Sequence, residues 1–311
     1  MTGRRAVLVL ANAKAGSGEH DQVDEVCQAL TAASPSGIEV RRPASDSAYT
    51  EAVASIVPGD GGGGRDVVVL GGDGSLNRLL QELHEQQLLE RCGAVGLVPM
   101  GTGNDLARDA GIPLRWEDAV RTAVTGPPTP RGLLVDDDAG VVVNVVHCGI
   151  AAEATAHASE VKGWLGKTAY AVGALRAGLT SEGWHLRVVV DGETVADGTD
   201  RVLMVSLALG SSVGGGTPIA PDAEPDDGLV DVLVATGTSA IARLGFARDL
   251  RKGRHTDRED VIATRGREVL VEAVTPGDAF RVNIDGDVCD EPDLRRRWRH
   301  LPRMWRLRVP D

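Results

Sequence analysis

The first 130 residues alternate apolar runs with helical patterns, and this alternation restricts the possible folds more than any other feature. Apolar runs lie at Ala6–Ala11, Ile38–Arg41, Asp66–Leu70 and Ala94–Val98, and helical patterns lie near residues 23–30, 49–57, 76–90, 106 and 117–124. Apolar strands that are joined by helices form parallel sheets with helices on both faces. The sequence therefore predicts an α/β domain at the start of the chain.

A change of pattern follows the segment Gly126–Pro130, which is rich in proline and marks a domain boundary. Beyond it, strand-like segments follow one another near residues 131–148, 184–190, 201–210, 228–235, 258–264, 267–274 and 279–285. Only two helical stretches, 163–180 and 239–252, interrupt them. This pattern predicts an antiparallel β-sandwich or barrel.

Composition excludes several classes of protein. The formal net charge of −12 argues against binding of nucleic acid by the chain as a whole. The four cysteines form no Cys-x-x-Cys pair and have no histidine at zinc-ligand spacing, so we expect free thiols. No apolar run approaches the roughly 20 residues that span a bilayer, and we expect a cytoplasmic protein or one bound peripherally to the inner face of the membrane.

The last 17 residues carry the opposite charge to the rest of the chain. Residues 295–311 contain seven arginines and one acid, Asp311, together with Trp298 and Trp305. One interpretation is a patch for phosphates or anionic lipid head groups. The other, which we favour, is a terminal strand whose arginines lie on a solvated face.

Three glycine-rich turns lie where a predicted strand ends and a helix begins. They are Asn12–Gly18, Gly71–Asn77 and the segment from Gly101 to Asp105. Glycine lets the backbone approach an anion closely, and the start of a helix offers free amide hydrogens to it. Because the carboxyl ends of parallel strands form the ligand-binding edge of an α/β sheet, the three turns predict a nucleotide phosphate site.

Two acidic residues, Asp73 and Asp105, lie in these turns, and the chain contains neither a Walker A motif nor the dinucleotide-binding glycine fingerprint. An acid beside a phosphate suits Mg²⁺ or a sugar hydroxyl. The alternative is that each aspartate is a helix N-cap. Since both residues follow a strand in a glycine turn, we favour the functional interpretation.

The motifs Gly-Gly-Asp-Gly-Ser-Leu-Asn (71–77) and Pro-Met-Gly-Thr-Gly-Asn-Asp-Leu-Ala-Arg (99–108) resemble those of the diacylglycerol kinase catalytic domain family, above all its bacterial lipid kinases. Residues 212–229 and the segment Val282–Asp287 resemble later motifs of the same family. The resemblance implies a Rossmann-like nucleotide-binding domain related to NAD kinases, then a β-sandwich, with the active site in the cleft. We assign residues 1–128, with a returning segment of about 295–311, to the first domain and residues 129–294 to the lipid-binding domain.

The resemblance implies ATP as co-substrate, Mg²⁺ and a set of site residues. The implied ATP-binding residues are Asn12, Ala13, Lys14, Ala15, Gly16, Gly71, Gly72, Asp73, Gly74, Ser75, Asn77, Thr102 and Asn104. The implied catalytic residues are Asp73, Asp105, Asp136 and Asp287, of which Asp287 would be the general base. The implied structural metal ligands are Glu224, Asp227 and the Leu229 carbonyl, although from the residues alone the segment 226–228 reads as a plain turn.

The sequence departs from the family pattern at several positions, among them two charged ones. Asp287 replaces the usual glutamate, and Arg78 replaces the usual glutamate after the Gly-Gly-Asp-Gly run. We expect an ATP-dependent kinase of diacylglycerol or a related lipid, acting in phospholipid metabolism. The alternatives are a sphingoid, ceramide or NAD kinase, or a nucleotide-binding lipid sensor with little turnover. The resemblance also leaves a homodimer open.

Overall fold

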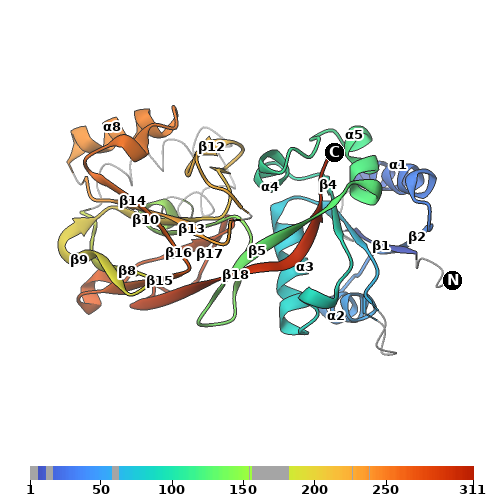
Figure 1. The fold of residues 1–311 in the computed structure, drawn as a ribbon, viewed down its shortest axis with the longest axis horizontal. Coiled ribbons are helices and arrows are strands. Elements are labelled where there is room, and N and C mark those ends of the chain that lie inside the picture. Colours follow the sequence, from blue (N-terminus) through green and yellow to red (C-terminus); the bar gives the residue numbers. More distant parts are fainter. Residues whose placement is uncertain are drawn as a thin grey trace. The chain divides into compact units, whose positions relative to one another are not determined.

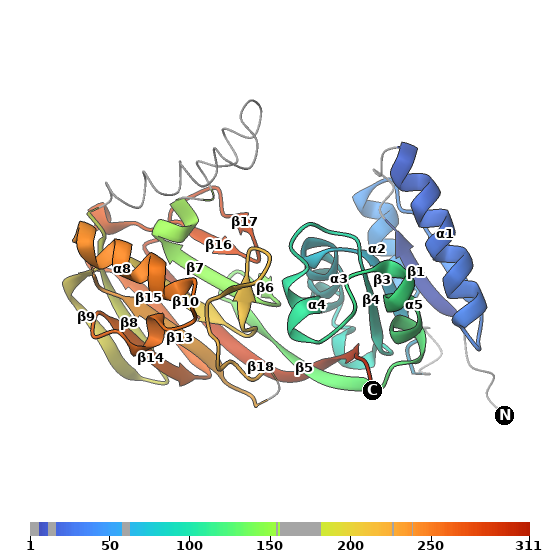
Figure 2. The ribbon, with the colours of Figure 1, turned by 90° about the horizontal axis from the view of Figure 1, so that it is seen from above.

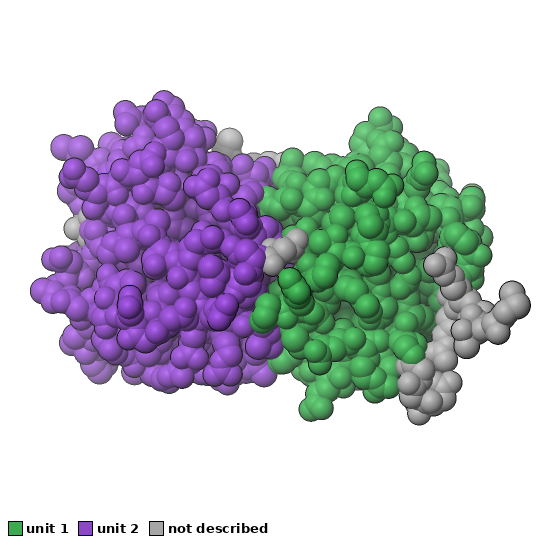
Figure 3. All heavy atoms as spheres, in the orientation of Figure 1, with its two compact units in different colours: residues 1–132, 302–311 green, residues 133–301 purple. Residues whose placement is uncertain are grey.

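The computed structural model describes residues 6–11, 17–57, 63–153, 155, 182–225, 227–237 and 239–311, and of residues 17–20 it describes the backbone only. The predicted helix 163–180 and the turn residues Asn12–Gly16 lie outside the described residues. Two compact units make up the chain, coloured separately in Figure 3. Unit 1 comprises residues 1–132 and 302–311, and unit 2 comprises residues 133–301.

Unit 1 contains the parallel sheet that the alternation predicts. Its strands, in the order β2-β1-β3-β4, all pair in parallel, and Leu307 of β18 pairs in parallel with Val95 of β4. The strands are β1 (Val7–Ala11), β2 (Ile38–Arg41), β3 (Val67–Gly71), β4 (Val95–Pro99) and the end of β18 (Arg295–Arg308). The residues of β1 and β4 are buried throughout, as expected for strands covered on both faces.

Helices cover this sheet, and Figure 2 shows α1 and α3 on opposite sides of it. The helical segments are α1 (Ser17–Ala33), α2 (Asp46–Ala54), α3 (Asp73–Glu85), α4 (Asp105–Asp109), α5 (Trp116–Thr125) and the 3₁₀ turn η1 (Leu89–Arg91). The helix predicted over 76–90 differs from the one observed, since α3 begins at Asp73 and ends at Glu85. It stops there because Gln87 adopts a left-handed backbone conformation with φ of 58°.

Unit 2 is an antiparallel sandwich of two sheets. One sheet has the order β14-β13-β10-β7-β16-β17; in the other, β15 pairs with β18 and β8, β8 pairs with β9, and β5 joins β18 to β6. The strands are β5 (Pro128–Asp136), β6 (Val141–Val142), β7 (Val145–Gly149), β8 (Trp184–Val190), β9 (Glu193–Val202), β10 (Met204–Ala208), β13 (Val230–Ala235), β14 (Val261–Gly266), β15 (Glu268–Ala273), β16 (Val282–Ile284) and β17 (Asp287–Val288). The small pair β11 (Ser212–Val213) and β12 (Thr217–Pro218), the helix α8 (Ala240–Leu250) and the turns η2 (His255–Asp257) and η3 (Pro276–Asp278) complete it. Figure 1 shows these strands with α8 over the six-stranded sheet.

The core of unit 2 lies between the two sheets. Val146 and Cys148 of β7 face it, and Val188 and Trp298 from the other sheet pack in the same cluster. On the opposite face of the six-stranded sheet, a second apolar cluster packs against Phe246 and Leu250 of α8. Inward and outward residues alternate along β15 and β18, whereas β10 is buried throughout because apolar clusters cover both faces of its sheet.

Candidate active site

Two glycine-rich turns meet at the carboxyl ends of the neighbouring strands β3 and β4. The Met100 amide donates to the carbonyl of Gly71 at 3.0 Å. A Cβ added to Gly72 would lie 2.9 Å from the Cα of Gly101, and one added to Gly101 would lie 2.7 Å from the Cα of Gly72. Neither position has room for a side chain, so the close approach of the two turns requires glycine at both.

Asn104 closes the second turn. Its backbone is left-handed, with φ of 53°, a conformation that asparagine tolerates better than most residues. Its side-chain amide donates to the Gly101 carbonyl at 2.7 Å, and its side-chain oxygen accepts from the Gly101 amide at 3.1 Å. The turn therefore has a fixed shape, and Thr102 lies exposed within it.

Asp73 joins the two turns through its carboxylate. One oxygen accepts from the Asp105 amide at 3.0 Å and the other from the Leu106 amide at 3.2 Å, so Asp73 caps α4, a helix that begins 32 residues further along the chain. The helix-capping interpretation thus describes what this side chain does in the structure, although across the two turns and not for its own helix. Its predicted part in Mg²⁺ binding and catalysis stays a prediction, as does that of the buried Asp105.

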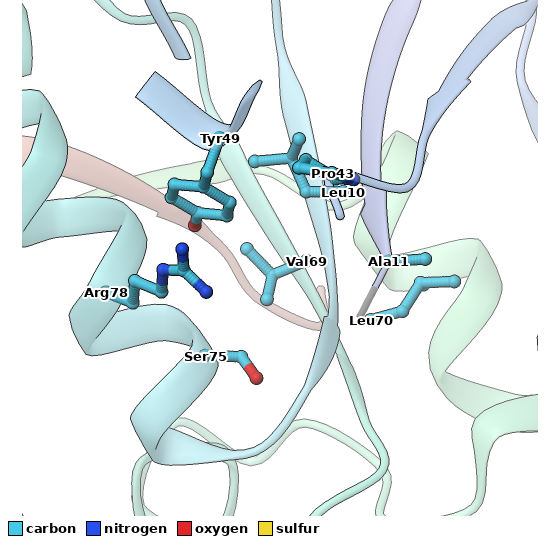
Figure 4. Close-up of a pocket in the computed structure, with 8 residues that line it drawn as sticks. All are labelled: Leu10, Ala11, Pro43, Tyr49, Val69, Leu70, Ser75 and Arg78. Atoms are coloured by element: carbon cyan, nitrogen blue, oxygen red, sulfur yellow. The ribbon is translucent and has the colours of Figure 1, made fainter. Parts of the chain in front are cut away.

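A small recess with a cavity volume of about 60 Å³ opens beside the first turn, at the ends of β1 and β3 (Figure 4). It is lined by Leu10, Ala11, Pro43, Tyr49, Val69, Leu70, Ser75 and Arg78. The Arg78 guanidinium lies 4.0 Å from the centre of the Tyr49 ring and pairs with Asp46 at 2.7 Å. Burial raises the pKa of Tyr49 to about 12, so its hydroxyl stays protonated at neutral pH.

The recess adds residues that the sequence motifs did not assign. Tyr49 and Pro43 come from α2 and from the loop before it, where no glycine turn marks a site. Arg78 stood out only as a departure from the family pattern. The structure brings Ser75 and Arg78 into the recess and places Gly71–Asn77, Thr102, Asn104 and Asp105 around the two turns, while Asn12–Gly16 lie outside the described residues.

The predicted base, Asp287, lies exposed in unit 2, on the short hairpin of β16 and β17. The neighbouring Asp285 fixes this hairpin, because its carboxylate accepts from the amides of Val143, Asn144 and Val145 at 2.7, 2.8 and 2.8 Å. Asn283 adds a hydrogen bond from the Gly286 amide at 3.1 Å. Asp287 is thus held on a hairpin that hydrogen bonds fix. The sequence motifs did not predict that Asp285 holds this hairpin, because its hydrogen-bond partners lie about 140 residues away in the chain.

Asp136 lies inside a network of charges and not at an open surface. Its side chain is 0% exposed and accepts from the Arg296 guanidinium, whose Nε lies 3.0 Å away. It also accepts from the amides of Asp138 and Gly140 at 3.0 and 2.7 Å. Arg296 binds Asp293 as well, at 3.0 Å. In this structure Asp136 therefore ties the β5–β6 turn to β18, and its predicted catalytic role stays a prediction.

The implied metal ligands do not fit a metal ion. One Asp227 oxygen accepts from the Leu229 amide at 2.9 Å, and the other is paired with the Arg265 guanidinium. Arg265 also lies 3.4 Å from Asp231, whose pKa is raised by burial. A cation carried by the chain, the Arg265 guanidinium, thus lies where the resemblance implies a metal. Among the described residues, no group of three or more His, Cys, Asp or Glu side chains is placed to hold a metal ion.

The basic terminal segment is engaged with the chain itself. Trp298 and Trp305 are buried. Arg295, Arg297, Arg299 and Arg308 pair with acids, and Arg306 donates to the Cys92 carbonyl at 2.8 Å. The expected terminal strand is observed, but two of its arginines do not lie on a solvated face. The side chains of Arg296 and Arg308 are only 10% and 15% exposed, and they pair with Asp136 and Asp66. In the part of the chain that the structure describes, no helix is long and apolar enough to cross a membrane.

Comparison with known proteins decides the family. Residues 6–133 match the Diacylglycerol kinase catalytic domain, and residues 144–308 match the YegS C-terminal NAD kinase beta sandwich-like domain. The chain belongs to the diacylglycerol kinase and YegS-like lipid kinase family. It is 31% identical to a diacylglycerol kinase of Mycobacterium tuberculosis over 71% of this chain and 70% of that protein. It is 29% identical to a protein of Pseudomonas putida named "Probable lipid kinase YegS-like", with 97% of each chain covered.

Solved structures agree with this family at the level of the fold. A diacylglycerol kinase from Bacillus anthracis str. Sterne matches with a TM-score of 0.77 and 20% identity, covering 99% of this chain and 98% of that one. A yeast NADH kinase, solved with NADH, matches with a TM-score of 0.54 and 12% identity, covering 100% of this chain and 84% of that one. The predicted architecture, an NAD-kinase-like α/β domain followed by a β-sandwich, is confirmed, and the chain is a lipid kinase by family.

Proposed function

We propose that this lipid kinase transfers the γ-phosphate of ATP to a hydroxyl of diacylglycerol or a related lipid, giving phosphatidic acid or an analogue. The observation that carries the proposal is the contact of two glycine turns at the carboxyl ends of β3 and β4, next to a recess with an apolar floor. Backbone amides at the start of a helix bind phosphate, and apolar recesses with a few polar groups bind the rest of a small ligand.

The residues of unit 1 would divide this work. Amides of the first turn of α3, a helix of 13 residues, bind the phosphates of ATP, and its nucleoside lies against the recess that Tyr49 and Arg78 help to line. By family resemblance Asn12–Gly16 and Thr102 add contacts to the nucleotide. Mg²⁺ enters with ATP as part of the co-substrate, and kinases commonly hold it through one or two carboxylates and the phosphates themselves. Asp105 and Asp73 are the carboxylates beside the turns.

Asp287 is the proposed general base. It would take the proton of the lipid hydroxyl while the oxygen bonds to the γ-phosphorus and ADP leaves. Aspartate is shorter than the glutamate of the family pattern by one methylene, about 1.5 Å of reach, and misplacement of about 1 Å can cost on the order of 100-fold in rate. Within unit 2, the hydrogen bonds of Asp285 hold the hairpin that carries this shorter side chain.

The test is transfer of labelled γ-phosphate from ATP with Mg²⁺ to lipids in mixed micelles. The panel contains diacylglycerol, monoacylglycerol, ceramide and sphingosine, with NAD as a soluble acceptor because of the fold shared with NADH kinase. We expect labelled phosphatidic acid from diacylglycerol. The Asp287→Ala variant should lose this product. The Asp290→Ala variant, which removes an exposed carboxylate three residues away, should retain it. Labelled ceramide, sphingosine or NAD alone would change the assigned acceptor. ATP binding without transfer to any acceptor would overturn the kinase and favour the lipid sensor.

A further inference from the structure

Helix α8 carries the two most exposed large apolar side chains of the described residues. Ile241 is 85% exposed and Leu244 is 56% exposed, and the two are one helical turn apart. On the other side of the helix, Phe246 and Leu250 pack against the apolar cluster of the six-stranded sheet. Figure 2 shows α8 along this sheet. The helix is therefore apolar on two faces, and only one of them is used by the fold.

The exposure of these residues does not come from a loosely held helix. Ser239 caps the start of α8, accepting from the Ala242 amide at 3.1 Å. Arg258 anchors the helix from the side, pairing with Asp249 at 3.1 Å and donating to the Ala242 carbonyl at 3.2 Å. A firmly anchored helix that keeps isoleucine and leucine in water has a binding surface and not a frayed end.

A cluster of positive charge continues the same surface. Arg248, Arg251, Lys252 and Arg254 are exposed. The one acid between residues 240 and 254, Asp249, pairs with both Arg248 and Arg258 at 3.1 Å. It offsets part of the Arg248 charge and leaves the charges of Arg251, Lys252 and Arg254 without an acid of this segment beside them. These four charges stand out in a chain whose formal net charge is −12. We call Ile241, Leu244 and these four basic residues the α8 surface.

We propose that the α8 surface docks on an anionic lipid bilayer, with Ile241 and Leu244 among the acyl chains and the four basic side chains on lipid phosphates. An exposed apolar edge flanked by Lys and Arg is the pattern of helices that lie in the membrane interface. A second copy of the chain is the weaker occupant, because a stable dimer buries about 800 Å² on each partner and two aliphatic side chains provide much less. The arginines of β18 are less suited to this purpose, since six of the seven bind acids or a carbonyl of the chain itself.

This inference complements the proposed function, because the acceptor lipid resides in the membrane, but its test does not depend on phosphoryl transfer. The full chain is sedimented, without nucleotide, with vesicles of phosphatidylcholine alone or with added phosphatidylglycerol. We expect binding only to the anionic vesicles, weakening as salt rises. Each basic residue near such a surface is worth about 1 kcal/mol, or about fivefold in affinity, so Arg251→Glu/Lys252→Glu should weaken binding by at least about 25-fold.

Two further variants make the test specific. Ile241→Ser/Leu244→Ser removes the apolar edge and should also release the protein, while retaining its circular dichroism spectrum and melting temperature. Arg91→Glu/Arg121→Glu makes the same change of net charge at exposed residues of unit 1 and should bind like the unaltered chain.

The proposal would be overturned if Arg251→Glu/Lys252→Glu bound anionic vesicles as tightly as the control Arg91→Glu/Arg121→Glu. Light scattering could instead show that the unaltered chain is a dimer and that the Ile241→Ser/Leu244→Ser variant is a monomer. That result would also overturn the proposal and assign the surface to self-association. Loss of kinase activity with vesicle binding intact would instead count against the proposed function alone.

Discussion

Removing the carboxylate of Asp136 should strongly destabilise unit 2. Its side chain is fully buried, accepts from Arg296 and two backbone amides, and balances a guanidinium that is itself only 10% exposed. Deleting one partner of a buried ion pair leaves the other charge uncompensated, which costs about 3–5 kcal/mol. We therefore expect Asp136→Ala to lower the free energy of unfolding by about that amount, with Asp293 sparing part of the cost through its contact with Arg296.

The matched control is Arg295, the neighbour of Arg296 on β18. Arg295 is half exposed and pairs with Glu272 at 3.1 Å and with Asp137 at 3.7 Å. Exposed pairs of this kind contribute about 0.2–1 kcal/mol, so Arg295→Met should change the stability by less than about 1 kcal/mol. Urea denaturation followed by circular dichroism measures both variants. A cost below about 1 kcal/mol for Asp136→Ala would refute the network, and normal folding with lost turnover would restore a catalytic role for Asp136.

Three further predictions concern other parts of the molecule. Gly72→Ala should weaken ATP binding in calorimetry and cost about 1–3 kcal/mol of stability, because its Cβ would meet Gly101. Gly74→Ala adds a Cβ with nothing within 4 Å and should leave the stability unchanged, so an equal loss of stability in the two variants would contradict the contact between the turns. Burial lowers the pKa of His147 to about 4, against about 6.5 in an unfolded chain, so the unfolded state binds more protons between these values. The free energy of unfolding should therefore fall by about 3 kcal/mol as the pH drops from 6.5 to 4, and His147→Gln should reduce that slope in acid denaturation. A chelator should leave the melting temperature unchanged, because Arg265 occupies the position of the implied metal; a fall would show that a bound metal stabilises the loop.

Local pattern was sufficient for most of the elements. The buried runs of β1, β3 and β4 and the helices between them follow from a periodicity that each segment carries by itself. The glycine turns were also predicted locally, because glycine itself marks a position where the backbone adopts a positive φ or approaches another segment closely. Boundaries were less certain: the predicted helix over 76–90 missed the left-handed Gln87, which no periodic signal marks.

The roles of single acids could not be obtained from local pattern. Asp73, Asp136 and Asp285 look alike in a sequence, yet one caps a distant helix, one balances a buried guanidinium and one holds three amides of another strand. Each role depends on a partner between 32 and 160 residues away. A side chain's protonation, reach and freedom are set by what the fold places beside it, and a motif does not contain that information.

The sequence by itself therefore determined the order of elements, the two-part α/β and β-sandwich architecture, the glycine turns and, through its motifs, the lipid kinase family. Tertiary structure alone decided that Arg265 pairs with Asp227, that six of the seven arginines of β18 bind groups of the chain itself, and that exposed basic residues gather at the end of α8. The physical reason is that backbone preferences and hydrophobic periodicity act over a few residues, whereas the pairing of charges is settled only when distant segments fold together.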